Sequence, residues 1–167
     1  TPESLVVIDL EGNIVEGTNR PTSEKEVHRQ IYLRREDAGM IIHAHTKKAM
    51  AVSVRKIREV PCLVEEMSQL IGGGIPITPQ YVPAEQHFQL GTAAAENIGN
   101  RNGVILRNHG PVAVGRNTEE AVLMVEVIEK ACEIFLDQGQ MFYAPIPQCY
   151  IDSERYRYLY KYGNENT

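Results

Sequence analysis

The spacing of apolar and polar residues along the chain predicts a mixed α/β domain. Short apolar runs bounded by glycine, proline or asparagine indicate strands, and apolar residues that recur three or four positions apart indicate helices. The expected strands cover residues 5–10, 14–16, 39–45, 61–64, 104–107 and 112–114. The expected helices are one that begins behind Ser23, three over residues 47–55, 65–70 and 84–98, and a long one that begins at Thr118.

Local signals at the ends of these elements sharpen the prediction. Residues 11–13 read Glu-Gly-Asn and are expected to form a hairpin turn, because glycine and asparagine tolerate the positive φ that such turns require. Ser23 and Glu26 match a capping box, which would place Glu24 in the first turn of a helix. The glycines at 72–74 lack the Lys-Ser/Thr of a phosphate-binding Walker motif, so they predict the end of a helix.

Composition narrows the class of protein. The 167 residues, of which 43% are hydrophobic, are enough for one domain with a substantial core. A net charge of −5 without a basic run makes nucleic acid an unexpected partner, and the absence of an apolar stretch of about 20 residues makes a membrane span unexpected. The three cysteines form no Cys-x-x-Cys pair, which favours free thiols and the cytoplasm. Because the chain opens on Thr1 and runs directly into a strand, we expect a fragment.

Three histidines provide the clearest chemical signal. His43 and His45 close one apolar run, and His109 closes another at the end of residues 103–106. Alternate residues of a strand share a face with Cα atoms roughly 6.5 Å apart, so two such imidazoles can bind one cation. A third imidazole from a second strand leaves a fourth position open, which is typical of catalytic zinc. The sequence therefore predicts a Zn²⁺ site, with Mn²⁺ and Co²⁺ as alternatives, and Glu24 lies upstream as a nearby carboxylate.

Each histidine alone has a simpler interpretation, as a chance pair on a strand or as a hydrogen-bonding residue at a strand end. Together they favour a metal, because burying three imidazoles without partners is costly. His28 follows Glu24 by one helical turn and could be a ligand or a buried neighbour of the site, whereas His87 is expected on a helix surface. A cupin would need a carboxylate shortly after the His pair, and residues 46–50 supply none. A metal-dependent barrel would need about 250 residues.

Several motifs then resemble the class II aldolase/adducin family along almost the whole chain. They are Leu5 to Gly12, Glu16-Gly17, Pro21-Thr22-Ser23-Glu24 with His28 and Ile31-Tyr32 behind it, Asp37-Ala38, His43-Ala44-His45, Asn108-His109-Gly110 and Val114-Gly115. The resemblance implies a three-layer fold, in which helices flank a central, mainly antiparallel sheet. It implies one domain over residues 1–167, in which the family's N-terminal helix and glycine-rich phosphate loop are missing.

The resemblance also implies which residues bind metal and move protons. The family's zinc ligands match His43, His45 and His109, and its acid/base carboxylate, which can also ligate the metal, matches Glu24. The implied activity is that of a carbon–carbon lyase, which cleaves a phosphorylated ketose such as L-fuculose 1-phosphate to dihydroxyacetone phosphate and an aldehyde. A family epimerase would carry aspartate in place of Glu24, so the longer side chain favours an aldolase.

Further family residues imply how substrate is held. Thr22 and Ser23 match hydroxyls that bind the substrate phosphate at a helix N-terminus, where backbone amides favour an anion. Tyr162 matches a tyrosine that reaches the active site of a neighbouring subunit and donates a proton, which implies a homotetramer with its site between subunits. The tyrosine-rich tail from Tyr156 onward has the aromatic and arginine content that is enriched at interfaces.

One departure keeps the reaction open. On an ungapped match, Glu65 stands where one aldolase of the family carries a tyrosine near its active site. A decarboxylase, dehydratase or epimerase that uses the same three histidines is therefore the alternative. A non-catalytic, adducin-like interaction domain is a third hypothesis, but such a domain has no need of an open metal site, and the retained histidines and Glu24 argue against it.

Overall fold

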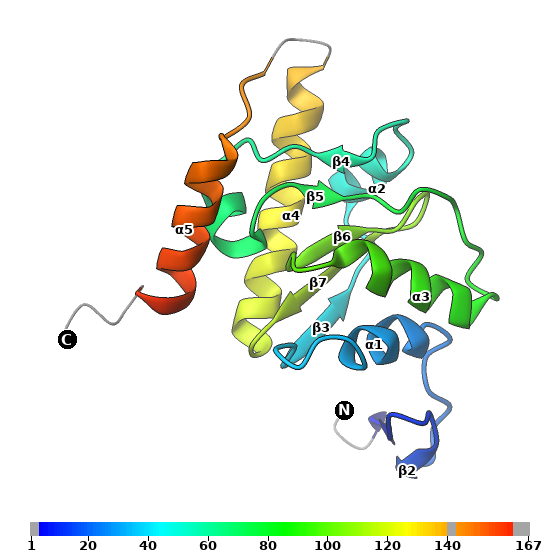
Figure 1. Cartoon of the computed structure of the whole chain (residues 1–167). Coiled ribbons are helices and arrows are strands. Elements are labelled where there is room, and N and C mark those ends of the chain that lie inside the picture. The colour runs from blue at the N-terminus through cyan, green and yellow to red at the C-terminus, as the bar shows by residue number, and fades with distance from the viewer. Residues whose placement is uncertain (1–3, 140–142, 162–167) are drawn as a thin grey trace.

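The computed structural model describes residues 4–139 and 143–161. In chain order (Figure 1) the elements are β1 (Val7–Ile8), β2 (Ile14–Glu16), α1 (Lys25–Tyr32), β3 (Met40–His43), α2 (Lys47–Ser53), β4 (Glu59–Val60), the π-helical turn η2 (Met67–Ile71), β5 (Ile75–Pro76), α3 (His87–Ile98), β6 (Gly103–Ile105), β7 (Pro111–Gly115), α4 (Thr118–Gln138) and α5 (Gln148–Tyr160). No helix in this described part of the chain is long and apolar enough to cross a bilayer.

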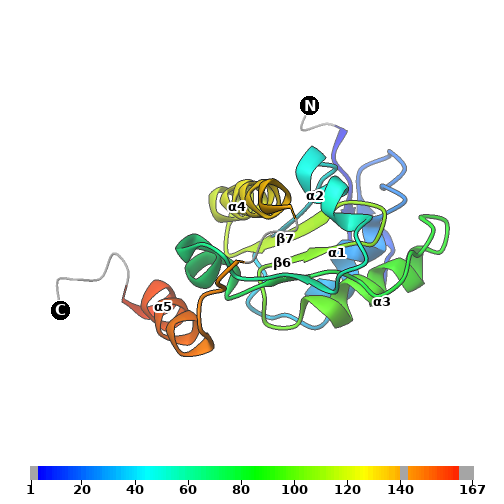
Figure 2. The same cartoon turned by 90° about the horizontal axis from the view of Figure 1, so that it is seen from above.

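The centre of the fold is an antiparallel sheet with strand order β3-β7-β6. Side chains alternate between its two faces: Val112 and Val114 pack with α1 and α3, whereas Ala113 between them packs with α4. Figure 2 shows α4 and α2 on one side of β6 and β7 and α1 and α3 on the other. This arrangement confirms the expected three-layer α/β fold with a mainly antiparallel sheet.

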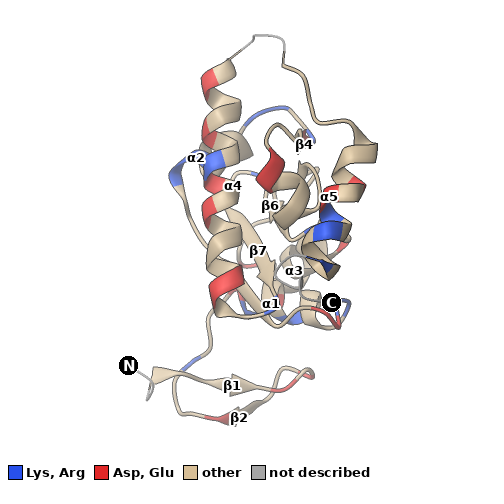
Figure 3. Ribbon diagram, turned by 90° about the vertical axis from the view of Figure 1, so that its left-hand side faces the viewer, with Lys and Arg blue, Asp and Glu red and all other residues tan. Residues whose placement is uncertain are grey.

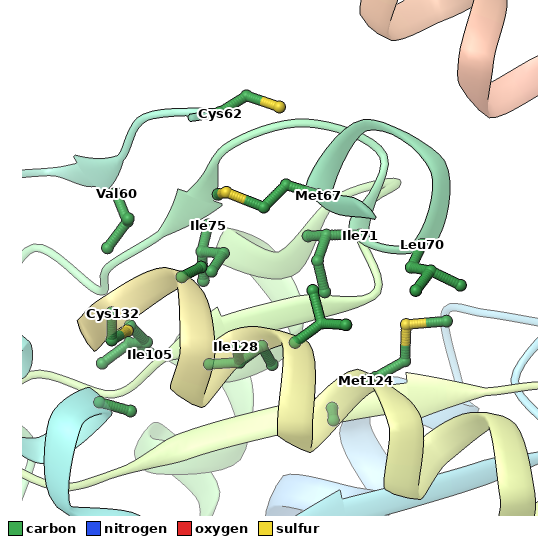
Figure 4. Packing of buried hydrophobic residues seen from close by; sticks show 14 of the residues in the cluster. Val60, Cys62, Met67, Leu70, Ile71, Ile75, Ile105, Met124, Ile128 and Cys132 are labelled. Carbon is green, nitrogen blue, oxygen red and sulfur yellow. The ribbon is translucent and has the colours of Figure 1, made fainter. Parts of the chain in front are cut away.

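The larger core lies between α4 and the segments that follow α2. Figure 4 shows Met124, Ile128 and Cys132 of α4 facing η2, β4 and β5. Gly72 ends η2 in the left-handed conformation, with φ of 89°, so the expected helix stop is confirmed. The expected strand over residues 61–64 is wrong, because β4 lies at Glu59–Val60, where Val60 pairs with Ile75 of β5.

The chain's first two strands form a separate hairpin. The two strands pair antiparallel, and Gly12 adopts a φ of 95° in the turn between them, as expected for residues 11–13. Figure 3 shows this hairpin standing apart from the central sheet. The connection from this hairpin to α1 contains Thr22, Ser23 and Glu24, which lie directly before the helix.

The tyrosine-rich tail folds as helix α5 along the outside of the core (Figure 1). The Tyr158 hydroxyl donates to Oε1 of Glu120, a buried residue in the first turn of α4, at 2.5 Å. Arg155 donates to the backbone carbonyls of Gln69 and Leu70, at the end of η2, at 2.8 and 2.7 Å. These contacts attach α5 to both α4 and η2.

Candidate metal centre

The sheet brings two histidine-bearing segments together at one of its ends. His43 is the last residue of β3 and pairs with Val112 of β7, while His109 lies in the turn between β6 and β7. Asn108 enters that turn with a φ of 55°, and the His109 amide donates to the Leu106 carbonyl at 3.1 Å. The β6–β7 hairpin predicted from the sequence is therefore confirmed, and it carries His109 toward His43.

His45 does not lie on the strand, which corrects the expected strand geometry. β3 ends at His43, although the Ala44 amide still donates to the Pro111 carbonyl at 3.1 Å. His45 therefore belongs to the three-residue connection that leads into α2. Gly110 packs against this connection and has no side chain to obstruct it. A Cβ at Gly110 would lie 2.3 Å from the Ala44 carbonyl oxygen and 3.1 Å from Cδ2 of His45.

Four side chains converge at this point. Glu24, His43, His45 and His109 each present a nitrogen or oxygen, and all four atoms lie within 4.8 Å of one another. The centroids of the three imidazole rings are 4.9 to 5.1 Å apart. The structure thus brings together the four residues that the sequence singled out as possible ligands.

The distances suit a shared cation. Two nitrogens that bind one zinc ion tetrahedrally, each at about 2.0–2.1 Å, stand about 3.3–3.4 Å apart. The Nε2 atoms of His43 and His109 are 3.4 Å apart. Three imidazoles and one carboxylate form a donor set of the kind used by catalytic zinc sites, so the residues present fit a divalent cation.

Glu24 reaches both of these imidazoles. Its Oε2 lies 3.2 Å from Nε2 of His43, and its Oε1 lies 3.0 Å from Nε2 of His109. The predicted capping box at this helix is wrong: α1 begins at Lys25, and no side chain caps it within the described residues. The carboxylate of Glu26 is instead bound by Arg29 at 2.9 Å. Glu24 therefore occupies the N-cap position rather than the first turn.

The surroundings of His43 and His109 favour neutral imidazoles. Nδ1 of His43 lies 2.9 Å from the Pro111 carbonyl oxygen, which can only accept, so Nδ1 carries the proton and Nε2 keeps its lone pair. Burial lowers the pKa of His43, whose side chain is only 6% exposed, and burial is also the main cause that lowers the pKa of His109. Neutral imidazole is the form that binds metals. The sequence did not predict that the Pro111 carbonyl orients His43, because every residue has a backbone carbonyl and the residue type does not show which one makes this contact.

The remaining candidate residues lie around this group or outside the described residues. Thr22 and Ser23 are exposed just before Glu24, and the Thr22 hydroxyl accepts the Glu24 amide at 3.2 Å. Burial lowers the pKa of His28, against the charge of Glu24, and His28 is not among the four converging residues. Thr22 and His28 help to line a cavity of about 390 Å³ between the β1–β2 hairpin and α1. Tyr162 lies outside the described residues.

Comparison with known proteins yields a consistent set of similarities. The family model described as "Class II Aldolase and Adducin N-terminal domain" matches residues 1–136. A 5-deoxy-D-ribulose 1-phosphate aldolase of Bacillus thuringiensis serovar kurstaki is 31% identical over 134 residues, which are 80% of this chain and 61% of that protein. The chain therefore spans about three fifths of the length of this relative.

Solved structures agree with this similarity. An L-fuculose 1-phosphate aldolase superposes with a TM-score of 0.86 and 28% identity, over 93% of this chain and 72% of the other. An L-fuculose-1-phosphate aldolase from Thermus thermophilus is 30% identical with a TM-score of 0.63, over 88% of this chain and 75% of the other.

Proposed function

The chain belongs to the class II aldolase and adducin family, and on this premise we propose that it is a metal-dependent aldolase. Its proposed substrate is a phosphorylated ketose of the L-fuculose 1-phosphate type, which it cleaves to dihydroxyacetone phosphate and an aldehyde. The observation that carries the proposal is the convergence of Glu24, His43, His45 and His109 at one end of the sheet. The names of the three similar proteins, all sugar-phosphate aldolases, support the substrate class.

The three histidines and Glu24 are the proposed ligands of the metal, and zinc is proposed over manganese or cobalt because three of the four donors are imidazoles. When bound, a divalent cation supplies Lewis acidity to the ketone and neighbouring hydroxyl of the substrate as the carbon–carbon bond breaks.

Glu24 is the proposed acid/base. In the cleavage direction the C4 hydroxyl releases its proton to solvent by way of the proposed Tyr162, and the C3–C4 bond breaks so that the aldehyde leaves and the electron pair stays on C3. Glu24, which has taken up a proton from solvent, then delivers that proton to C3. Its carboxylate is half-buried and faces the imidazoles of His43 and His109, so it can turn toward a substrate bound beside them. Thr22 and Ser23, exposed just ahead of α1, are proposed to bind the phosphate at the N-terminal end of that helix.

The test replaces Glu24 by glutamine, which keeps the size of the side chain and removes its ability to exchange a proton. We expect Glu24→Gln to lower turnover roughly 10²-fold or more, the usual scale for a positioned acid/base, with most of the metal retained. Aldehyde release from a panel of ketose 1-phosphates measures turnover. Glu26→Gln is the matched control, since Glu26 lies on the same helix and binds Arg29. Near-normal turnover of Glu24→Gln would remove it from the mechanism.

A decarboxylase, dehydratase or epimerase of the same family is the second candidate, and Glu65 is the observation that favours it. The sequence resemblance places Glu65 where an aldolase of the family carries a tyrosine, and its carboxylate accepts a hydrogen bond from the side-chain amide of Gln69 at 3.1 Å. Carbon dioxide released from β-keto acids, without aldehyde from ketose phosphates, would select a decarboxylase. A non-catalytic adducin-like domain is disfavoured because it would not need the four converging side chains.

The proposed assembly is a homotetramer in the cytoplasm with its active site between subunits, where Tyr162 of one subunit exchanges the proton of the substrate's C4 oxygen. Tyr156 and Tyr160 of α5 support an interface, because both are more than half exposed and their rings pack 5.0 Å apart. The free thiols Cys62, Cys132 and Cys149 are typical of a reducing compartment. Light scattering on the longest natural form of the protein tests the assembly: a monomer would contradict it, as would full activity of Tyr162→Phe.

A further inference from the structure

His45 is the ligand candidate that the sheet does not hold. His43 lies on β3 and His109 in the β6–β7 turn, whereas His45 lies two residues beyond the end of β3 and two residues before α2. It is also the exposed member of the group. Its position therefore depends on where α2 begins.

Helix α2 is fixed at that beginning by a residue of α4. One carboxylate oxygen of Glu129 accepts the Lys48 amide at 2.9 Å, and the other accepts the Ala49 amide at 3.0 Å. These amides belong to the first turn of α2, where backbone donors have no partner within the helix. The Thr46 side chain provides no cap, and the first turn of α2 contains no acidic residue. Glu129 thus supplies the cap and the negative charge from a different helix.

Glu129 is itself held by a rigid element. Its neighbours on α4, Val127, Ile128, Ala131 and Cys132, are buried in the larger core. Burial alone would raise the pKa of Glu129, but the hydrogen bonds from α2 hold it below the usual range, so the carboxylate is charged at neutral pH. Figures 1 and 3 show α2 lying beside α4.

The other end of α2 is tied to the segment that carries His109. The Arg107 guanidinium donates to the carbonyls of Arg55 and of Ile57, the latter at 2.7 Å, and the Asn108 amide donates to the Ser53 carbonyl at 3.3 Å. Helix α2 therefore connects the two loops that carry His45 and His109, and its N-terminal end is fixed to α4 through Glu129.

We propose that Glu129 is a positioning residue that sets the place of His45 relative to His43 and His109 by fixing the first turn of α2. The proposal rests on the metal site proposed above. Without the carboxylate, the first turn of α2 loses two hydrogen bonds and the negative charge that faces it. His45 is then no longer held in place relative to the other two imidazoles. Residues that support metal ligands in this way change affinity by about 10- to 100-fold when they are replaced.

The test compares Glu129→Ala and Glu129→Gln with Glu133→Ala in the full chain. Glu133 lies one turn further along α4 and binds the Lys48 ammonium at 2.8 Å, so its removal deletes an acidic contact with the same residue of α2 without touching the α2 amides. Zn²⁺ affinity is measured by competition with a chromophoric chelator. Coordination geometry is followed by the visible bands of bound Co²⁺, and the position of His45 by its imidazole NMR signals in the metal-free protein.

We expect about 10- to 100-fold weaker Zn²⁺ binding and altered Co²⁺ bands for Glu129→Ala, a smaller change in the same direction for Glu129→Gln, and wild-type values for Glu133→Ala. The metal-free His45 signals should move in the Glu129 variants, with those of His109 affected less. If Glu129→Ala does not fold, Glu129→Gln carries the comparison. If Glu129 only stabilised the fold, its replacement would lower the unfolding temperature but leave the Zn²⁺ affinity and the Co²⁺ bands unchanged, and this result would overturn the proposal. An equal loss of Zn²⁺ affinity in Glu133→Ala would also overturn it. A wild-type protein that binds no Zn²⁺ would instead overturn the metal site itself.

Discussion

Replacing two of the three imidazoles should abolish the stabilisation that a metal gives to the folded chain. In the variant His43→Ala/His45→Ala, only His109 and Glu24 remain, with Nε2 and Oε1 3.0 Å apart. A ligand that binds only the folded state adds RT ln(1 + [L]/Kd), which is about 2.7 kcal/mol when free Zn²⁺ is 100 times Kd. For a chain of this size each kcal/mol shifts the unfolding temperature by about 2–4 °C, so Zn²⁺ should raise the wild-type value by about 5–11 °C.

The measurement is thermal unfolding of chelator-treated protein with and without Zn²⁺, together with elemental analysis. The wild type should hold about one ion per chain and show the upward shift, whereas the double variant should show neither. His87→Ala is the matched control, because His87 is exposed at the start of α3 and outside the converging group. Only the metal-induced shift is compared, since removing the buried His43 also changes the stability of the metal-free protein. An unchanged shift and metal content in the double variant would refute the assignment of the ligands.

Two further predictions concern the metal-free protein. Burial lowers the pKa of three histidines: His28, His43 and His109. As the pH drops through their ordinary pKa of 6.5, the unfolded chain therefore takes up more protons than the folded one. The free energy of unfolding, measured by urea denaturation, should decrease as the pH is lowered from about 7.5 to about 5.5, and an increase would contradict the prediction. Tyr158→Phe removes a hydrogen bond to the buried Glu120 carboxylate, and should cost about 1.5 kcal/mol and lower the unfolding temperature by about 3–6 °C. Tyr156→Phe, on the exposed side of α5, should change the unfolding temperature by less than about one degree. Equal decreases in the two variants would contradict the conclusion that Tyr158 attaches α5 to α4.

Local signals in the sequence were sufficient for the elements that carry His109 and for α4. The apolar run before Asn108 and the one after Gly110 are both short and separated by turn residues, and the structure pairs them as β6 and β7. Thr118 opens α4 as predicted, and the Asn117 side chain caps it by accepting the Glu120 amide at 2.9 Å. These elements depend on neighbours a few residues away, which a sequence displays directly.

The elements that were misplaced depend on partners far away in the chain. β4 lies at residues 59–60 because Val60 pairs with Ile75, and no local signal distinguishes it from the apolar residues that follow. The capping box at Ser23 fails because Arg29 takes the carboxylate of Glu26. The amides that Glu129 accepts are about 80 residues away from it, so its position on a regular helix offered no hint of that contact.

The four converging residues are held with unequal firmness, and this difference agrees with their proposed roles. His43 and His109 are attached to β3, β6 and β7, whose pairing runs through the centre of the fold. Glu24 is attached through α1, which rests on α3 across Gly91, where a Cβ would lie 2.4 Å from the Glu26 carbonyl oxygen. Glu24 itself lies just outside this packed helix, at its N-cap, so a rotation of its side chain moves the carboxylate without disturbing the imidazoles. A site that must keep its metal while exchanging a proton needs this combination of fixed nitrogens and a movable carboxylate.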